Sequence, residues 1–317
     1  MKLYISEHEK SGGIHVFDLS DKRVDEIQFI KLDRPTYFTI EGDKLYAVLR
    51  DPFGTMESGM VTFDIAKDGT LYNMSKTVAT NGKSGCHISV NKWGIYIANY
   101  RSANICKMPD RVVVHTGGGP NTERQEEAHP HFAKITPDGK YIIATDLGTD
   151  EVYLYDKNLK EISRCKLPCG VGPRHIAFNK DKKTVYISLE LSSEVATLSL
   201  SGDKLEYIGS QKTIPNGYNI ENFPAAIRVK DDFLYVSNRG HDSIAVFDIK
   251  EKAPKLLENV SSFGENPRDF YIKGKGLVCV NRISGDIVFY KLINGMPKRE
   301  DIKLKVNSPT CVILDDR

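Results

Sequence analysis

Seven copies of one short phrase constrain this chain more than any other feature: a β-rich run, a polar turn and a second β-rich run. The copies begin near residues 2, 44, 94, 140, 184, 233 and 276, so the phrase recurs every 40 to 50 residues. Clear examples are "KYIIATDLGTDEVYLYD" and "FLYVSNRGHDSIAVFDI". Because β-branched and aromatic residues fill both runs and turn residues separate them, each copy predicts a β-hairpin.

A second phrase, such as "PHFAKI" or "PRHIAF", precedes every hairpin except the first. Its last copy, "PTCVIL" at 309–314, has no hairpin after it, so the two orphan pieces can pair and close a ring. More variable runs such as "EISRCKL" supply a fourth, outer strand. We therefore predict an all-β fold with one domain over 1–317, a seven-bladed β-propeller of four-stranded antiparallel blades. The C-terminal strand pairs with the N-terminal hairpin, which leaves no unpaired inner edge.

Charge and cysteine content limit the partners that we expect. The 44 Lys and Arg residues nearly balance the 42 Asp and Glu residues, which gives no electrostatic reason to expect nucleic acid or a membrane surface as partner. The start, "MKLYISEHEK", reads as a strand and a turn, and no apolar stretch is long enough to span a bilayer. Six scattered cysteines without a CxxC pair indicate reduced thiols, so we expect a cytoplasmic protein; its protein partners stay open.

Two columns of residues are predicted to meet at one mouth of the central channel. Because adjacent strands are antiparallel, the start of each innermost strand lies at the same edge as the end of the second strand. Both columns contain His, Arg and acidic residues, which a hydrophobic core does not select. The columns are Thr36, Cys86, His131, Arg174, Ala225, Arg268 and Thr310, and His8, Arg50, Tyr100, Asp146, Glu190, Arg239 and Arg282.

Arginines, carboxylates and histidines that converge on a channel mouth predict a site for a small anionic molecule. The candidate catalytic residues are His131, Glu190, Arg174 and Arg239. The candidate substrate-binding residues are Arg268, His129, His175, His87 and Arg50. The alternative is that these charges form structural ion pairs between blades, and Asp269 offers Arg268 a local partner. We expect Asp146 to cap a turn, and His175 to face the neighbouring blade and hold Arg174.

Other chemistries find little support in the sequence. His129 and His131 offer two metal ligands without a third at metal-site spacing, so we expect no metal and no cofactor. The glycine-rich "TGGGPNTERQ" (116–125) does not follow a strand and open a helix, so we expect a rim loop or a lid over the mouth. No GxSxG elbow or Cys/His pair indicates a covalent nucleophile.

Several segments resemble the lactonase family of seven-bladed propellers. These are "HPHFAKITPDGKYIIATDLGTDEVYLYD", "GVGPRHIAFNKDKKTVYISLELSSEV", "FLYVSNRGHDSIAVF" and "NPRDF". The family includes propeller-type 6-phosphogluconolactonases and 3-carboxy-cis,cis-muconate lactonizing enzymes, and the similarity is strongest between about 115 and 285. The resemblance implies a metal-independent site on one face of the ring. The matching family motifs fall on His129 and His131, Arg174, Glu190 and Arg239.

The first functional hypothesis is hydrolysis of a small anionic sugar lactone, 6-phosphogluconolactone above all, to 6-phosphogluconate. Glu190 or His131 takes a proton from water, while Arg174 and Arg239 stabilise the oxyanion or bind the phosphate. Which of Glu190 and His131 is the base and which the acid stays open. Two alternatives remain: a cycloisomerase of the carboxymuconate type with the same residues, and a non-catalytic propeller that binds other proteins.

Overall fold

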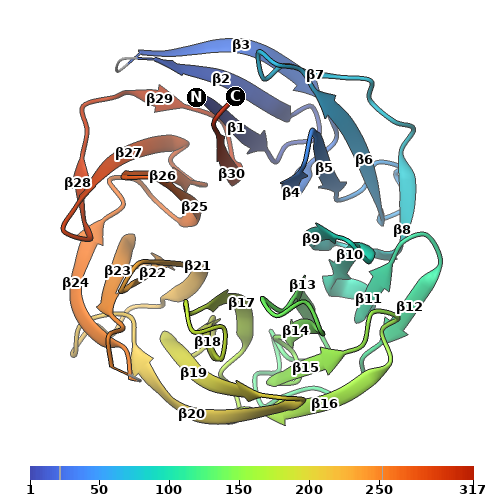
Figure 1. Cartoon of the computed structure of the whole chain (residues 1–317), viewed down its shortest axis with the longest axis vertical. Coiled ribbons are helices and arrows are strands. Elements are labelled where there is room, and N and C mark those ends of the chain that lie inside the picture. Colours follow the sequence, from blue (N-terminus) through green and yellow to red (C-terminus); the bar gives the residue numbers. More distant parts are fainter. Residues whose placement is uncertain (21–22, 252) are drawn as a thin grey trace.

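Seven antiparallel sheets form a ring around a central channel (Figure 1). The structure, a computed structural model, describes residues 1–20, 23–251 and 253–317. The one helical turn within these ranges, η1 (Tyr100–Ser102), is far too short to span a membrane. The seven antiparallel sheets confirm the predicted all-β seven-bladed propeller.

The strands occupy four positions in each blade, counted outward from the channel. The innermost strands are β4 (Pro35–Glu41), β9 (Gly85–Asn91), β13 (Pro130–Ile135), β17 (Pro173–Phe178), β21 (Phe223–Lys230), β25 (Pro267–Lys273) and β30 (Pro309–Asp315). The second strands are β1 (Lys2–Glu7), β5 (Lys44–Leu49), β10 (Gly94–Asn99), β14 (Ile142–Asp146), β18 (Thr184–Leu189), β22 (Phe233–Arg239) and β26 (Gly276–Asn281).

The outer half of each blade is more variable in length. The third strands are β2 (Gly13–Ser20), β6 (Glu57–Ile65), β11 (Asn104–Lys107), β15 (Glu151–Tyr155), β19 (Glu194–Ser201), β23 (Ser243–Asp248) and β27 (Asp286–Ile293). The outermost strands are β3 (Arg23–Lys31), β7 (Leu71–Tyr72), β8 (Val78–Lys83), β12 (Arg111–Val114), β16 (Glu161–Lys166), β20 (Lys204–Lys212), β24 (Lys255–Ser261), β28 (Met296–Arg299) and β29 (Leu304–Lys305).

Two blades differ from the predicted four strands because their outer strand is divided in two. Strands β7 and β8 both pair with β6, and β28 and β29 both pair with β27. Between β7 and β8, Asn73 has a φ of 49°, which is incompatible with extended backbone. The division affects only the rim of the ring, so the inner strands that shape the channel keep their positions.

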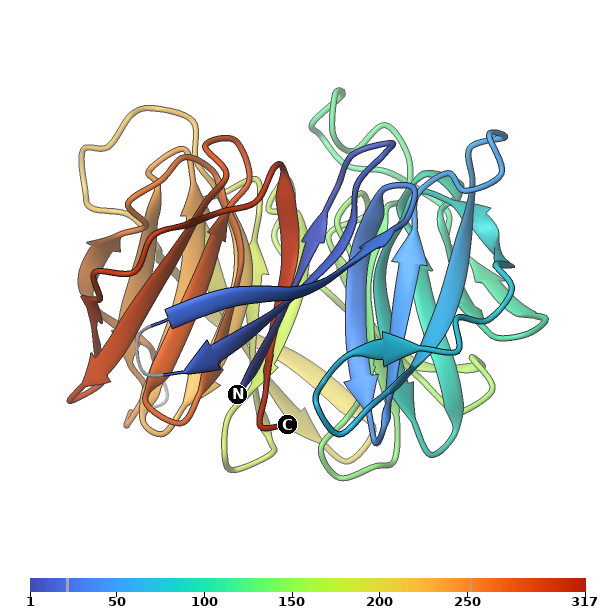
Figure 2. The same cartoon turned by 90° about the horizontal axis from the view of Figure 1, so that it is seen from above.

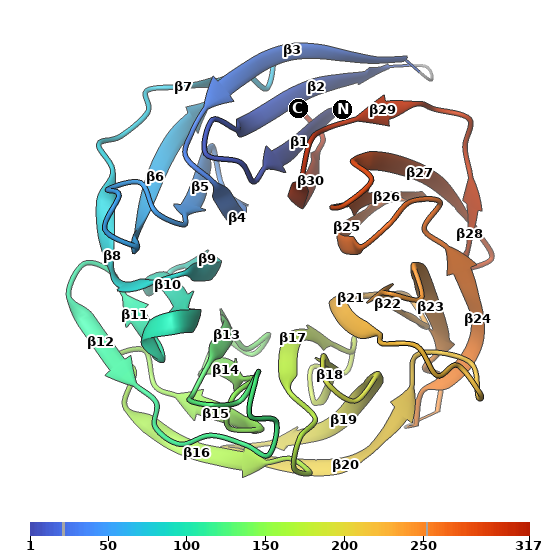
Figure 3. The same ribbon diagram turned by 180° about the vertical axis from the view of Figure 1, so that it is seen from behind.

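The ring closes as the orphan strands predict. β30 pairs antiparallel with β1, with Leu3 opposite Leu314 and Ile5 opposite Val312. Strand β30 descends from the face where the innermost strands begin, and the C-terminus lies near the opposite face (Figure 2). We call these the front face and the rear face. Seen from behind, the innermost strands of all blades surround the same channel (Figure 3).

Buried tyrosines of the second strands connect neighbouring blades. The hydroxyl groups of Tyr4, Tyr96 and Tyr235 donate hydrogen bonds of 2.6–2.7 Å to carbonyl oxygens in outer turns of the next blade. Each ring is fully buried, so the aromatic body packs between two sheets while the polar tip finds a partner. These contacts connect neighbouring blades at their outer turns.

Candidate active site

A β-bulge interrupts every innermost strand near the front face. A bulge leaves one or two residues without a partner on the next strand and turns their side chains in a new direction. His131 and Arg174 lie in two of these bulges, which explains how polar side chains at these positions leave the sheet and enter the channel. The shifts lie between Pro35 and Tyr37, Gly85 and His87, Pro130 and Phe132, Pro173 and Ile176, Pro224 and Ile227, Pro267 and Asp269, and Pro309 and Val312.

Serines on the second strands satisfy the backbone groups that the bulges release. The Ser188 hydroxyl accepts the amide of His175 at 3.2 Å and donates to the carbonyl of Ala225 in the next blade at 2.9 Å. Ser237 accepts the amide of Ala226 at 3.0 Å in the same way. Because buried amides are costly without partners, these serines allow the bulges to persist.

Glu190, at the end of β18, lies at the centre of a cluster of arginines. Its Oε2 atom is 2.9 Å from Nε of Arg174 and 2.7 Å from Nη2 of Arg239, and its Oε1 atom accepts a hydrogen bond from Arg124. The side chain of Glu190 is only 4% exposed. Phe223 supports the cluster, since the guanidinium groups of Arg124 and Arg239 lie over its ring at 5.8 and 5.9 Å. Three residues of the predicted catalytic set therefore meet here.

The charge of Glu190 is fixed by its neighbours. Burial alone raises the pKa of a carboxyl group, but Arg239, Arg174 and Arg124 outweigh it and hold the pKa of Glu190 well below its usual range. Glu190 is thus a carboxylate at neutral pH. A carboxylate so strongly stabilised is a poor proton acceptor at neutral pH, and Glu190 pairs with three arginines.

A cavity of about 240 Å³ opens at the front face beside Glu190. His131 lines it with its ring buried, and Nδ1 of this ring has no hydrogen-bond partner. Burial and the positive charge of Arg174 hold the pKa of His131 well below 6.5, so the imidazole is neutral at pH 7. The other lining residues are Thr36, Arg50, Ser84, Gly85, Cys86, Tyr100, Arg101, Arg124, Arg239 and Arg268.

Positive charge dominates this cavity, because five arginines and one carboxylate line it. Burial and the nearby Arg239 lower the pKa of Arg174 to about 10, which still leaves the group charged at neutral pH. Burial, together with Arg268 and Arg50, lowers the pKa of His8 to about 3. The cavity therefore has the electrostatic character of a binding site for an anion.

The predicted residues divide into those that line the front cavity and those that lie behind it. His131, Glu190, Arg239, Arg268 and Arg50 line the cavity, whereas Arg174 is 2% exposed and lies beneath Glu190.

The remaining three predicted residues are placed elsewhere. His129 stacks on Tyr100 at 4.1 Å between ring centroids, outside the cavity lining. His175 contacts the neighbouring blade through His131, at 5.3 Å between rings, and lies deeper in the channel. His87 lines a different cavity.

Two structural expectations have opposite outcomes. Asp146 caps its turn as predicted, because its Oδ1 atom accepts the amides of His129, Gly148 and Thr149 at 2.7–3.0 Å. The alternative in which Asp269 is the local partner of Arg268 is not the one observed, since Asp269 pairs with Arg228 at 3.0 Å. Arg268 lies in the bulge between Pro267 and Asp269 and lines the front cavity, whereas Arg228, the partner of Asp269, lines the same separate cavity as His87.

Sequence reasoning missed Arg124. It belongs to the 116–125 segment, which we expected to form a rim loop or lid, and its side chain reaches Glu190. Gln125 anchors this loop through hydrogen bonds to the Leu147 carbonyl at 2.8 Å and to Asp150 at 2.7 Å. The arginine-rich character of the mouth was the available signal, but the position of a loop side chain depends on tertiary contacts.

Metal and thiol chemistry can be assessed from the same side chains. The pair His129–His131 does not form one ligand set: Nε2 of His129 lies 3.3 Å from Glu126, and His131 faces the cavity. Glu126, Glu127 and His129 have ligand atoms within 4.8 Å of one another, but both carboxylates are exposed. Burial raises the pKa of the Cys86 thiol, the one cysteine in the cavity lining, to about 12, so Cys86 remains a thiol at neutral pH.

Comparisons with known proteins agree with this fold. The family described as "Lactonase, 7-bladed beta-propeller" matches residues 2–314. The chain belongs to this family. It is 34% identical to the 6-phosphogluconolactonase of Bacillus subtilis (strain 168), and the match covers 91% of this chain and 90% of the relative.

Solved structures show the same architecture. A protein from Lactobacillus plantarum superposes with a TM-score of 0.90 and 28% identity, covering 98% of this chain and 99% of that one. The periplasmic gluconolactonase of Pseudomonas aeruginosa superposes with a TM-score of 0.87, 23% identity and 98% coverage of both chains. This second similarity, at 23% identity, supports only the fold.

Proposed function

We propose that this chain hydrolyses a sugar lactone, 6-phosphogluconolactone in particular, by metal-independent general acid/base catalysis. The observation that carries the proposal is the front cavity, where neutral His131 lies beside Glu190 and the arginines that Glu190 holds. The name of the Bacillus subtilis relative supports the same reaction. A phosphorylated lactone supplies the negative charge that the five lining arginines require.

In the proposed reaction His131 is the base. Its Nδ1 atom has no partner in the protein, and the imidazole is neutral, so the ring is free to accept a proton from water. Without substrate, the positive charge of Arg174 lowers the pKa of His131. A bound phosphate offsets the charge of the arginines, and this raises the proton affinity of His131 when substrate is present.

Water then adds to the lactone carbonyl, and the carbonyl oxygen becomes an oxyanion. Arg239 and Arg268 line the cavity and supply fixed positive charge for that oxygen or for the phosphate. The C–O bond to the ring oxygen breaks, and protonated His131 returns its proton to that oxygen. Glu190 keeps Arg174 and Arg239 in position and remains ionised throughout.

The test measures hydrolysis of 6-phosphogluconolactone by folded His131→Ala, Arg239→Met and Lys140→Met proteins. Loss of the base is expected to lower kcat by about 10²–10⁴-fold. Arg239→Met is expected mainly to raise KM if the arginine binds phosphate, or to lower kcat if it stabilises the oxyanion. Lys140 is exposed in the turn between β13 and β14, far along the blade from the mouth, and serves as the matched control. Wild-type rates in both site variants would overturn the proposal.

A carboxymuconate assayed in parallel distinguishes hydrolysis from cycloisomerisation, because both reactions use anionic substrates. Turnover of that substrate alone would replace the proposed reaction at the same site. We further propose a cytoplasmic location. All six cysteines are free, and five of them are buried, which suits a reducing compartment.

A further inference from the structure

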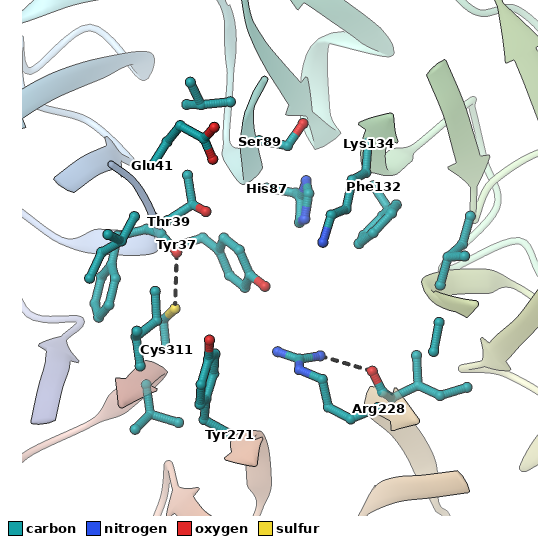
Figure 4. A pocket seen from close by; sticks show the side chains of 18 of the residues that line it. Tyr37, Thr39, Glu41, His87, Ser89, Phe132, Lys134, Arg228, Tyr271 and Cys311 are labelled. Atoms are coloured by element: carbon teal, nitrogen blue, oxygen red, sulfur yellow. Dashed lines mark hydrogen bonds between the residues drawn. The ribbon is translucent and has the colours of Figure 1, made fainter. Parts of the chain in front are cut away.

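A second, larger cavity occupies the rear half of the channel. Its volume is about 420 Å³, and it shares no lining residue with the front cavity. The residues that line it come from the middle and the end of the innermost strands, beyond the bulges. Figure 4 shows Tyr37, His87, Lys134, Arg228 and Tyr271 around it. Its volume is in the range of sites that hold small organic molecules.

A layer of aromatic rings separates the two cavities. His87 lies 4.1 Å from Phe132 and 4.8 Å from Tyr37 between ring centroids, and His175 lies 5.8 Å from His87. His131, which lines the front cavity, contacts His175 from the other side at 5.3 Å. These rings fill the waist of the channel, so each cavity can be occupied independently of the other.

Polar groups without protein partners point into the rear cavity. The ammonium group of Lys134 extends into it (Figure 4) and forms no ion pair or hydrogen bond with the residues that the structure describes. Lys134 keeps contact with solvent in the channel, although surrounding protein atoms and Arg228 lower its pKa. The hydroxyl groups of Tyr37 and Tyr271 also point inward, again without a hydrogen-bond partner in the described parts of the chain.

Arg228 is held rigidly at the edge of the same cavity. Its Nη1 atom donates to the Ile227 carbonyl at 2.9 Å, and its Nη2 atom pairs with Asp269 at 3.0 Å. Asp269 is 2% exposed and lies behind the guanidinium group, which is itself 25% exposed. A pre-oriented guanidinium loses little conformational entropy when it binds a ligand.

The lining contains one acidic side chain, Glu41, at the rear rim. It is exposed and forms no ion pair with Lys134 within 4 Å among the described residues. A ligand can therefore place a negative group deep in the cavity, near Lys134 and Arg228. The hydroxyl groups of the same ligand can donate to Glu41 and can form hydrogen bonds with Tyr37 and Tyr271.

We propose that the rear cavity is a second binding site, specific for a small hydroxylated anion that carries a carboxylate or a phosphate group. Lys134 and Arg228 bind the anionic group, and Tyr37, Tyr271 and Glu41 bind the hydroxyl groups. The site is open at the rear face, while the lactone site proposed above opens at the front face. The rear site therefore stands or falls independently of lactone hydrolysis.

Calorimetric titration with 6-phosphogluconate tests the proposal, because this probe carries both anionic groups and several hydroxyls. The wild-type protein is expected to bind two molecules. Lys134→Met removes the ammonium group and is expected to weaken one binding event by about tenfold to a hundredfold. Arg239→Met is expected to weaken only the other event. Titrations with gluconate and with inorganic phosphate then show which anionic group the rear site prefers.

Two further variants protect the result against misfolding and nonspecific charge effects. Tyr271→Phe keeps the ring and removes only the hydroxyl, and it is expected to weaken the same event as Lys134→Met by a smaller factor. Lys140→Met removes an exposed lysine of the same blade and is expected to change neither event.

The outcomes separate the two sites. Binding that depends on Lys134 but not on Arg239 supports the rear site, even where the front site takes up no ligand. Binding that depends on Arg239 alone overturns the rear site. Failure of all three probes to bind overturns it as well.

Discussion

The front and rear ends of the channel are built from the same seven strands, yet they treat charge in opposite ways. At the front, Arg174 within its bulge and Arg239 at the end of β22 both pair with Glu190, so the protein itself supplies a partner for these two charges. At the rear the strand ladders are regular, and Lys134 stays without a partner within the described residues. The ion pairs of the front cavity are therefore in place before a ligand binds, whereas the ammonium group of Lys134 in the rear cavity is left to solvent or a ligand.

Among the variants that test this contrast, Glu190→Gln is expected to have the largest effect on stability. Removal of one partner from a buried ion pair typically costs about 3–5 kcal/mol, because the remaining charges stay buried without compensation. We expect a loss of this size in the free energy of urea unfolding, and partial recovery when phosphate is added, since an anion can replace the carboxylate. Glu123→Gln, at an exposed position of the loop that contains Arg124, is the control. Equal stability of the two variants would show that the front cluster is not organised by Glu190.

The next test concerns the ring layer between the two cavities. Burial holds the pKa of His175 well below 6.5, so the unfolded chain binds a proton that the folded chain does not. Stability that is complete above about pH 6.5 is therefore lost as the pH falls, by about 1.4 kcal/mol per pH unit for each such histidine.

His175→Phe removes this titration and both unpartnered ring nitrogens while keeping an aromatic ring. The slope of unfolding free energy against pH, measured between pH 7 and about pH 5.5, is expected to decrease by the contribution of one proton. An unchanged slope would mean that the layer admits water and does not separate the cavities.

A smaller effect is expected for Tyr235→Phe. The tyrosine hydroxyl donates to the Gly295 carbonyl of the next blade at 2.7 Å. Loss of a neutral hydrogen bond costs about 0.5–1.5 kcal/mol, which thermal unfolding can measure. Tyr207→Phe is the control, because Tyr207 packs against its core cluster and its hydroxyl makes no hydrogen bond with the described residues. A similar decrease in both variants would indicate lost packing instead of a broken contact between blades.

The smallest effect is predicted for Lys134→Met. Because the ammonium group has no protein partner, its removal is expected to change the free energy of unfolding by no more than about 0.5 kcal/mol. The value follows from the same urea titrations. Destabilisation as large as that of Glu190→Gln would show that the two ends of the channel are equally dependent on their charges.

Almost all of the fold could be predicted from the sequence, because the same short β-hairpin phrase recurs seven times. The orphan phrases at residues 2–19 and 309–314 predicted ring closure, and β1 pairs with β30. The divided outer strands could not be predicted, since the outer runs vary most and Asn73 breaks one of them through its backbone conformation.

The candidate site was harder to predict because simple alternation fails at the bulges. Within the bulge at 173–176, Arg174 and His175 are consecutive, yet both side chains lie in the channel at different depths. Alternation assigns only one of two neighbours to a face. Arg124 escaped prediction for another reason: its contact with Glu190 joins a loop to a strand 66 residues away.

Closure by β30 also has a consequence for synthesis. During translation the first hairpin leaves the ribosome long before residues 309–315, the strand that will cover its inner edge. Until then β1 presents unpaired backbone groups, and such edges recruit strands from other nascent chains. Once residues 309–315 have been made and have paired with β1, this inner edge is covered.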